Sequence, residues 1–257
     1  MERWCGKVAL ITGAATGIGK ATVSKLLEHG MKVVGCGRRL EALQELESTF
    51  GSKGELTIIP CDVSKEDDVI SMFSKIKEKY GGVDVCINNA GLSKSSPILS
   101  GKSEDWQLVF DVNVMGVLRI TREAVASMKS KGAKECHIIN INSLSGHQVR
   151  PPAHSHVYAA SKFALTAITQ GTRHELFDMQ SELNCRVSQI SPRLVETPFI
   201  GLHLGDERAA AIFSQMKALE PEDVAQTVVY QLGLPAHAQV QDVLISPLQP
   251  TTWIVRS

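Results

Sequence analysis

Three polar side chains in the middle of the sequence could together carry out acid–base chemistry. Tyr158 and Lys162 are four residues apart, a spacing that puts both on one face of a helix. Ser143 ends an apolar run that is typical of a buried strand. With 27 Lys plus Arg in the chain, a Tyr–Lys pair at this spacing can arise by chance, so the pair alone is weak support. If the strand end and the helix start meet at one edge of a sheet, the hydroxyl, the phenol and the ammonium can surround one substrate oxygen.

The chemistry that suits this group is hydride transfer coupled to proton transfer. A phenol with its reference pKa of about 10 is a poor base at pH 7, and we expect the Lys162 ammonium to lower the pKa of Tyr158. Tyr158 can then give a proton to a carbonyl oxygen or take one from an alcohol. Ser143 can hydrogen-bond the same oxygen. Ser143 and Tyr158 are therefore the predicted substrate contacts and, with Lys162, predicted catalytic residues.

A glycine-rich segment, Thr12–Gly19, joins a predicted strand to a predicted helix with the spacing Gly-x-x-x-Gly-x-Gly. Glycines there permit a tight turn and let backbone N–H groups approach a pyrophosphate at the helix N-terminus. A purely structural turn would use glycines as well, but the position between strand and helix favours a dinucleotide site. The predicted cofactor contacts in this segment are Gly13, Thr16, Gly17, Ile18 and Gly19.

Two arginines, Arg38 and Arg39, follow the second predicted strand. An NAD site would have a carboxylate there for the ribose 2′-hydroxyl, whereas arginine accommodates a 2′-phosphate. The alternative is a pair of solvated arginines at a helix start, which the helix dipole disfavours. The pair therefore predicts NADP(H) as the cofactor.

Short apolar runs alternate with longer amphipathic runs along the chain. The expected strands are Lys7–Thr12, Lys32–Cys36, Leu56–Cys61, Val83–Ile87, His137–Asn142, Arg186–Ile190 and Val240–Ile245. The expected helices are Ile18–His29, Leu40–Thr49, Lys65–Tyr80, Ser103–Lys129, His156–Ser181 and Glu220–Leu232. This pattern predicts an α/β fold, a Rossmann-like doubly wound parallel sheet of about seven strands in a single domain over residues 1–257. Ligands of such a sheet bind beyond the carboxyl ends of its strands, where Ser143 and the glycine-rich segment are expected.

Composition excludes several kinds of partner. The chain has 257 residues with 27 Lys plus Arg and 27 Asp plus Glu, and zero net charge argues against nucleic acid and anionic membranes. No run approaches the roughly 18 apolar residues of a membrane span, and no signal peptide is evident, so we expect a cytoplasmic protein. The six cysteines form no Cys-x-x-Cys pair and no zinc-type cluster with histidine, which favours reduced thiols and no metal site.

The motifs, in this order, resemble those of the short-chain dehydrogenase/reductase family, and the resemblance covers nearly the whole chain. They are Thr12-Gly13-x-x-x-Gly17-x-Gly19, Asp62-Val63, Asn88-Asn89-Ala90-Gly91, Asn113-Val114-x-Gly116, Ser143, Tyr158-x-x-x-Lys162 and Ser191-Pro192. The phrases His137–Ser143 and Ser145–His147 resemble more closely a subgroup that includes the farnesol dehydrogenases. The resemblance implies NADPH-linked reduction of steroid or other apolar ketones.

The resemblance also implies roles for residues that spacing alone does not single out. The implied cofactor contacts are Asp62 and Val63 at the adenine end, Asn89, Ala90 and Gly91 along the cofactor, and Val195, Glu196 and Thr197 near the nicotinamide carboxamide. Asn113 would be a fourth catalytic residue, interrupting its helix and holding a water that links Lys162 to solvent. Lys162 would reach the nicotinamide ribose beside Tyr158. Family members pair the helix of Tyr158 across subunits, which implies a homo-oligomer, a dimer or tetramer.

Other features shape the expected substrate pocket. The family usually has Pro-Gly where this chain has Pro192-Arg193, and an arginine with a different φ could disturb the cofactor fit. Residues 194–217, with the apolar stretch Phe199–Leu204, are a predicted substrate lid, although ordinary core is the alternative. The segment Arg150–His156 is expected to form an extended loop beside the pocket. The histidines His147, His154 and His156 are interpreted as loop residues, not as acids or ligands.

The sequence therefore predicts an NADP(H)-dependent oxidoreductase that acts on an apolar ketone or secondary alcohol, a ketosteroid- or isoprenoid-like carbonyl compound, with Tyr158 as general acid and base. The first alternative is a non-catalytic NADP(H)-binding regulatory protein on the same fold. Arg193, which stands where the family usually has glycine, is the departure from the family pattern that supports this alternative. The second is an interaction or structural protein, which would leave the Ser, Tyr and Lys set unexplained.

Overall fold

The buried strands of this protein send their side chains alternately to two faces of one sheet. We describe a computed structural model over residues 1–149 and 155–248, apart from the side chains of residues 202–204, 206 and 208. Every residue of β1 (Val8–Thr12) is buried; Ala9 and Ile11 belong to one hydrophobic cluster, Val8 and Leu10 to a second. Because successive side chains of a strand point to opposite faces, a strand that is apolar throughout must be covered on both faces.

Seven strands form one parallel sheet in the described residues, in the order β3-β2-β1-β4-β5-β6-β7. The other six are β2 (Lys32–Gly37), β3 (Leu56–Pro60), β4 (Val85–Asn88), β5 (Cys136–Ile141), β6 (Cys185–Pro192) and β7 (Asp242–Ile245). The predicted Rossmann-like fold in a single domain is thereby confirmed.

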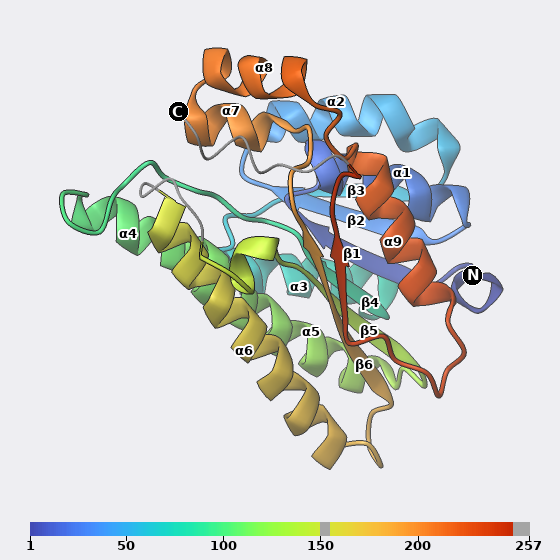
Figure 1. Ribbon diagram of the computed structural model, residues 1–257. Helices are drawn as coiled ribbons and strands as arrows, with labels where there is room; N and C mark the ends of the chain where they lie inside the picture. Colours follow the sequence, from blue (N-terminus) through green and yellow to red (C-terminus); the bar gives the residue numbers. More distant parts are fainter. Residues whose placement is uncertain (150–154, 249–257) are drawn as a thin grey trace.

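Helices cover both faces of the sheet (Figure 1). They are α1 (Gly17–Glu28), α2 (Leu40–Phe50), α3 (Glu66–Tyr80), α4 (Ser103–Phe110), α5 (Val117–Lys131), α6 (His156–Asp178), α7 (Pro198–Leu204), α8 (Asp206–Gln215) and α9 (Pro221–Gly233). Helix α1 packs against α9 and contributes Val23 to the first cluster, while α3 packs against α5 and contributes Met72 to the second. None of the helices within residues 1–149 and 155–248 is long and apolar enough to cross a membrane.

The strand order reverses at β1, which lies between β2 and β4. After β1 the chain runs to β2 and β3 on one side, and it later returns to β4 on the other side. Such a switch point opens a crevice at the carboxyl ends of the two strands. The glycine-rich segment follows β1 and Asn89–Gly91 follows β4, so both predicted cofactor segments lie beside this crevice.

The long helix expected over Ser103–Lys129 is divided by a turn of π-helix over Asp111–Gly116, which separates α4 from α5. Asn113 lies in this π turn, at the interruption that the resemblance implied. Gly116 lets the turn pack closely, because a Cβ there would lie 2.9 Å from Cγ2 of Val63. A turn of π-helix inside a helix often marks a functional position.

Candidate active site

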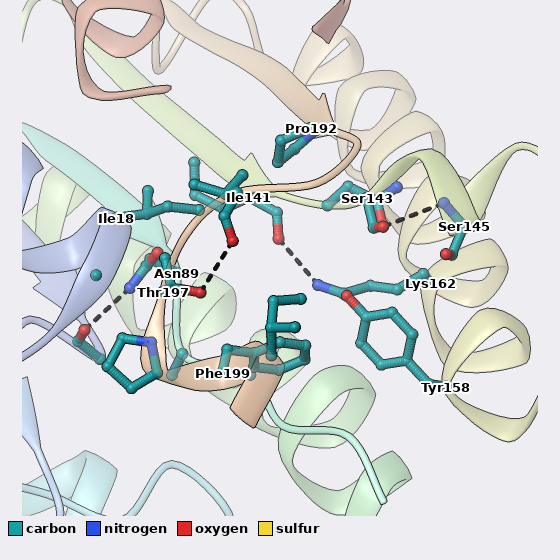
Figure 2. Close-up of a pocket in the computed structure, with 18 of the residues that line it drawn as sticks. Ile18, Asn89, Ile141, Ser143, Ser145, Tyr158, Lys162, Pro192, Thr197 and Phe199 are labelled. Atoms are coloured by element: carbon teal, nitrogen blue, oxygen red, sulfur yellow. Dashed lines mark hydrogen bonds between the residues drawn. The ribbon is translucent and has the colours of Figure 1, made fainter. Parts of the chain in front are cut away.

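A cavity of about 370 Å³ lies at the carboxyl ends of the central strands (Figure 2). Its walls come from the glycine-rich segment, the loop after β4, the turn after β5, the first turns of α6 and the segment after β6. The predicted site residues that line it are Gly13, Thr16, Gly17, Ile18, Asn89, Ala90, Gly91, Ser143, Tyr158, Lys162, Val195 and Thr197. The fold therefore brings most of the predicted cofactor and catalytic residues around one space.

The glycine-rich segment turns tightly at the N-terminus of α1. Gly13 has φ +64°, and a Cβ there would lie 2.9 Å from Cα of Ala90, so a side chain would collide with the loop after β4. A Cβ on Gly19 would lie 2.2 Å from the Gly13 carbonyl oxygen. The Thr16 side chain makes no cap bond, and the first turn of α1 has no acidic side chain. The turn lines the cavity, and the N–H groups of a helix start that no side chain caps can bind an anion such as a dinucleotide pyrophosphate.

Thr12 ties this segment to the loop after β4. Its Oγ1 accepts hydrogen bonds from the backbone N–H groups of Asn89, at 3.0 Å, and Ala90, at 2.9 Å. The Asn89 side-chain amide in turn donates to the carbonyl oxygens of Thr12, at 2.8 Å, and Gly13, at 3.0 Å. The two predicted cofactor segments are therefore one hydrogen-bonded unit across the switch point.

Ser143, Tyr158 and Lys162 converge on one side of the cavity. Ser143 follows β5, and its Oγ accepts a hydrogen bond from the Ser145 backbone N–H at 3.1 Å. Lys162 is buried and donates from Nζ to the Ile141 carbonyl oxygen at 3.0 Å (Figure 2). The same Nζ lies 5.8 Å from the centre of the Tyr158 ring, and Ser143 lies close enough to the Tyr158 phenol to lower its pKa.

The protonation states differ from the sequence-based expectation for the phenol. Desolvation raises the pKa of Tyr158 to about 12, and the Ser143 side chain only partly opposes this rise. The expected lowering of the Tyr158 pKa by Lys162 is therefore wrong, because the loss of solvent around the phenol is the largest influence on its pKa and disfavours the charged form. Desolvation also lowers the pKa of Lys162 to about 8, so this side chain stays mostly charged at pH 7.

Asn113 braces the catalytic helix from the side of the π turn. Its Oδ1 accepts from the Leu92 backbone N–H at 2.9 Å, and its Nδ2 donates to the Leu92 carbonyl at 2.8 Å and to Ser161 Oγ at 3.0 Å. Ser161 Oγ donates to the Tyr158 carbonyl oxygen at 2.7 Å. The amide thus fixes the helical turn between Tyr158 and Lys162, although Asn113 does not line the cavity.

The segment after β6 forms the last wall. Val195 pairs with Leu219 in an isolated bridge, and the Glu196 N–H donates to the Leu219 carbonyl at 2.8 Å, so both ends of the α7–α8 excursion are joined. Thr197 precedes α7, in which the Phe199 ring centre lies 5.7 Å from that of Tyr158. A Cβ on Gly17 would lie 3.0 Å from Cγ2 of Thr197, which places this wall directly against the start of α1.

Arg193 does not need the freedom of a glycine. No described residue other than glycine has a positive φ, so the Arg193 backbone is in an ordinary region. Its N–H donates to the Ile245 carbonyl at 2.9 Å and extends the pairing of β6 with β7. The departure from the family pattern therefore adds a side chain to the cavity wall without straining the backbone.

Some predicted residues do not line the cavity: Gly19, Arg38, Arg39, Asp62, Val63, Asn113 and Glu196. Arg38 and Arg39 are exposed where β2 runs into α2. The Ala14 N–H donates to the Cys36 carbonyl at 3.0 Å, so the end of β2 adjoins the glycine-rich segment. Asp62 Oδ1 accepts from the Ser64 backbone N–H and hydroxyl at 3.0 and 2.8 Å, which shapes the loop after β3.

The structure adds residues that the sequence did not single out as site residues. Ile141 supplies the carbonyl that holds Lys162, Ser145 lines the cavity beside Ser143, and Ile200 joins Phe199 in the apolar wall. The sequence could not indicate these roles, because the Ile141 acceptor is a backbone carbonyl and Ile200 reaches the cavity from a helix far along the chain. Among the histidines, His147 enters a polar network described below, His156 begins α6, and His154 lies outside the described residues with most of the segment Arg150–His156. In the described part of the chain, no group of His, Cys, Asp and Glu side chains could hold a metal ion.

Comparisons with known proteins agree with this fold and site. The family model for short chain dehydrogenases matches residues 7–208, and the chain belongs to this family. It is 49% identical to dehydrogenase/reductase SDR family member 11 of Gallus gallus over 254 residues, which are 97% of this chain and 99% of that protein. It is 39% identical to a farnesol dehydrogenase of Aedes aegypti, with 96% of this chain and 98% of that protein covered.

The resemblance to the subgroup of farnesol dehydrogenases is thereby confirmed. Among solved structures, the closed form of a serine dehydrogenase complexed with NADP+ superposes with a TM-score of 0.84 at 30% identity, covering 95% of this chain and 97% of that one. Other similar structures hold 5-hydroxy-NADP or NAD. Family membership and these structures support dehydrogenase/reductase activity on a small molecule with a nicotinamide cofactor.

Proposed function

We propose that this protein is an NADP(H)-dependent carbonyl reductase for apolar ketones, with Tyr158 as the general acid. The observation that carries the proposal is the convergence of Ser143, Tyr158 and Lys162 on a cavity whose other wall is the glycine-rich start of α1. When bound, NADPH supplies a hydride to the carbonyl carbon. The protein's own groups must then hold the carbonyl oxygen and give it a proton.

The residues present fit this cofactor. The N–H groups at the start of α1 would hold the pyrophosphate, while Asn89–Gly91, Val195 and Thr197 would flank the nicotinamide half. Arg38 and Arg39 are exposed beside the glycine-rich segment, and no carboxylate directly follows β2. Guanidinium groups there favour a ribose bearing a 2′-phosphate, which supports NADP(H) over NAD(H).

The protonation states suit reduction. With a pKa raised to about 12, Tyr158 holds its proton at pH 7 and can give it to the carbonyl oxygen as negative charge develops there. The Lys162 ammonium would stabilise the phenolate that this step leaves, and Ser143 would hold the substrate oxygen by a hydrogen bond.

The cavity wall supports an apolar substrate. Ile18, Pro192, Phe199 and Ile200 line it. We propose that residues 194–217 act as the substrate lid, because α7 carries Phe199 against Tyr158 while the bridge between Val195 and Leu219 joins the two ends of the segment. The name of the Aedes aegypti relative agrees with an isoprenoid-like substrate.

A kinetic screen tests the proposal. NADPH oxidation would be measured with ketosteroids, isoprenoid aldehydes, quinones and short ketones, in the wild-type protein and in Tyr158→Phe. We expect turnover with apolar carbonyls that falls roughly 10²–10⁴-fold in Tyr158→Phe, while NADPH still binds. Tight NADPH binding without turnover of any carbonyl would instead favour a non-catalytic cofactor-binding protein.

A further inference from the structure

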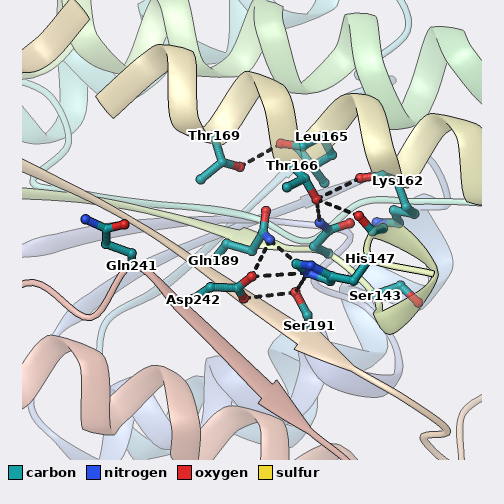
Figure 3. Close-up of polar contacts among 12 residues, drawn as sticks. Ser143, His147, Lys162, Leu165, Thr166, Thr169, Gln189, Ser191, Gln241 and Asp242 are labelled. Atoms are coloured by element: carbon teal, nitrogen blue, oxygen red, sulfur yellow. Dashed lines mark hydrogen bonds and ion pairs between the residues drawn. The ribbon is translucent and has the colours of Figure 1, made fainter. Parts of the chain in front are cut away.

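A network of polar side chains lies beside the turn that carries Ser143 (Figure 3). Its acceptor is Asp242 on β7. Asp242 Oδ1 accepts from Ser191 Oγ at 3.0 Å, and Oδ2 accepts from Gln189 Nε2 at 2.8 Å. His147 Nε2 lies 3.1 Å from Asp242 Oδ2 and 2.9 Å from Ser191 Oγ. The tautomer with its proton on Nε2 donates to the carboxylate, and the Gln189 amide nitrogen lies 3.3 Å from the same ring nitrogen.

The network joins parts of the chain that are far apart in sequence. Gln189 and Asp242 are partners in the register of β6 and β7, and Ser191 lies two residues further along on the same face of β6. His147 directly follows the short 3-10 turn Leu144–Gly146, which begins immediately after Ser143. The last strand of the sheet therefore reaches the turn of the predicted catalytic serine through one imidazole.

The same turn is held on its other side by α6. Thr166 Oγ1 donates to the Gly146 carbonyl at 3.1 Å and accepts from Asn142 Nδ2 at 2.8 Å. A Cβ on Gly146 would lie 2.7 Å from the Lys162 carbonyl oxygen, so the turn packs directly on the helix backbone. Thr166 thus fixes the turn against α6, and His147 fixes it against β6 and β7.

We propose that His147 and Asp242 form a positioning pair that holds the turn Ser143–Gly146, and with it the Ser143 hydroxyl, opposite Tyr158. The turn itself is short, with the Gly146 N–H donating to the Ser143 carbonyl at 2.9 Å and the His147 N–H to the Leu144 carbonyl at 3.0 Å. Because few hydrogen bonds lie within the turn, its position depends on the contacts that Thr166 and His147 make with the neighbouring elements. A misplacement of about 1 Å at a catalytic group can lower a rate by roughly 100-fold. This inference rests on the proposed function, because it assigns Ser143 to the substrate oxygen.

Loss of the imidazole should not unfold the protein. Without His147, Asp242 keeps its hydrogen bonds from Ser191 and Gln189. The positive charge of Arg173 on α6 also interacts with the Asp242 carboxylate. The carboxylate therefore stays compensated in His147→Ala, and the expected change is a looser turn.

The test compares His147→Ala and His147→Gln with a matched control, His137→Gln. The glutamine side chain can place an N–H close to the position of the imidazole Nε2. His137 is a buried histidine of β5 whose Nε2 lies 2.9 Å from Ser188 Oγ on β6, so its replacement disturbs a similar contact at the start of the strand. We would measure kcat and KM for a carbonyl substrate, the Kd for NADPH, and amide hydrogen exchange of residues 143–149.

In His147→Ala we expect kcat to fall roughly 10- to 100-fold, with KM and the NADPH Kd changed by less than about threefold. Hydrogen exchange in the turn should become about tenfold faster. His147→Gln should restore both readouts to within about threefold of wild type, and His137→Gln should leave both unchanged. A wild-type kcat or wild-type exchange in His147→Ala would overturn the inference, and so would an equal loss of kcat in His137→Gln.

The two proposals can fail separately. A wild-type protein that binds NADPH but reduces no carbonyl would overturn the proposed function. Hydrogen exchange would still decide the positioning role, because it reports on the Ser143 turn without turnover. Unchanged exchange in His147→Ala would then overturn the positioning pair on its own.

Discussion

Replacing Lys162 by methionine should make the NADPH-free protein more resistant to unfolding at pH 7 while removing its activity. Burial lowers the pKa of Lys162 from 10.5 to about 8, which corresponds to a destabilisation of about 3 kcal/mol at about 1.4 kcal/mol per pKa unit. Methionine removes this cost but leaves the Ile141 carbonyl without its donor, which costs roughly 1–3 kcal/mol. The expected net gain at pH 7 is about 1 kcal/mol.

The pH dependence of this difference in the free energy of unfolding is a stricter test than its magnitude at pH 7. Below pH 8 the lysine is protonated in both the folded and the unfolded chain, so the cost of burying its charge is fully present. Between about pH 8 and 10.5 the folded protein holds a neutral amine while the unfolded chain is still charged, so the cost fades as pH rises. Wild type should therefore gain about 2 kcal/mol relative to Lys162→Met between pH 7 and pH 9.5.

Urea unfolding of both proteins at the two pH values would measure this change. The matched control is Lys7→Met, which replaces an exposed lysine and should change the free energy of unfolding by less than about 0.5 kcal/mol at either pH. A difference between wild type and Lys162→Met that is the same at pH 7 and pH 9.5, or that moves in favour of the variant, would refute the reasoning. Omitting NADPH matters because a bound cofactor adds its own stabilisation.

Three further predictions concern catalysis. Arg38→Asp should lower the NADPH-to-NADH ratio of kcat/KM at least roughly tenfold, because a carboxylate repels a 2′-phosphate and accepts from a 2′-hydroxyl; an unchanged ratio would remove the basis for the NADP(H) assignment. The kcat/KM for reduction should be flat from pH 6 to 7 and fall above about pH 8, because Lys162 loses its proton there while Tyr158, with a pKa of about 12, keeps its own. A rate that rises through pH 8 would contradict these roles. Phe199→Ala should raise KM for a steroid-like ketone roughly tenfold and affect a short ketone less, because half-buried apolar contact is lost; equal changes for both substrates would argue against a substrate-contacting lid.

Some features of the fold and of the site could be predicted from the sequence and others could not, because only some residues leave a pattern along the chain. The apolar runs locate β1 and β5 because a doubly covered strand must be apolar throughout, and the glycines of Thr12–Gly19 mark a turn that no side chain would permit. The hydrophobic periodicity predicted one helix over Ser103–Lys129. The π turn changes how the following residues are placed around the helix axis, but it does not interrupt the periodicity that marks a helix in the sequence. The raised pKa of Tyr158 could not be predicted, since desolvation depends on atoms contributed by distant segments.

The sequence by itself determined the sheet, the family and the residue types of the site, since these depend on local periodicity and on motifs in chain order. The tertiary structure alone decided which groups act on one another. It placed Phe199 from α7 against Tyr158, gave the Ile141 carbonyl to Lys162, and linked Asp242 of the last strand to the Ser143 turn through His147. These contacts join residues separated by 21 to 95 positions. Their geometry follows from how the strands and helices pack, and no pattern along the chain records it.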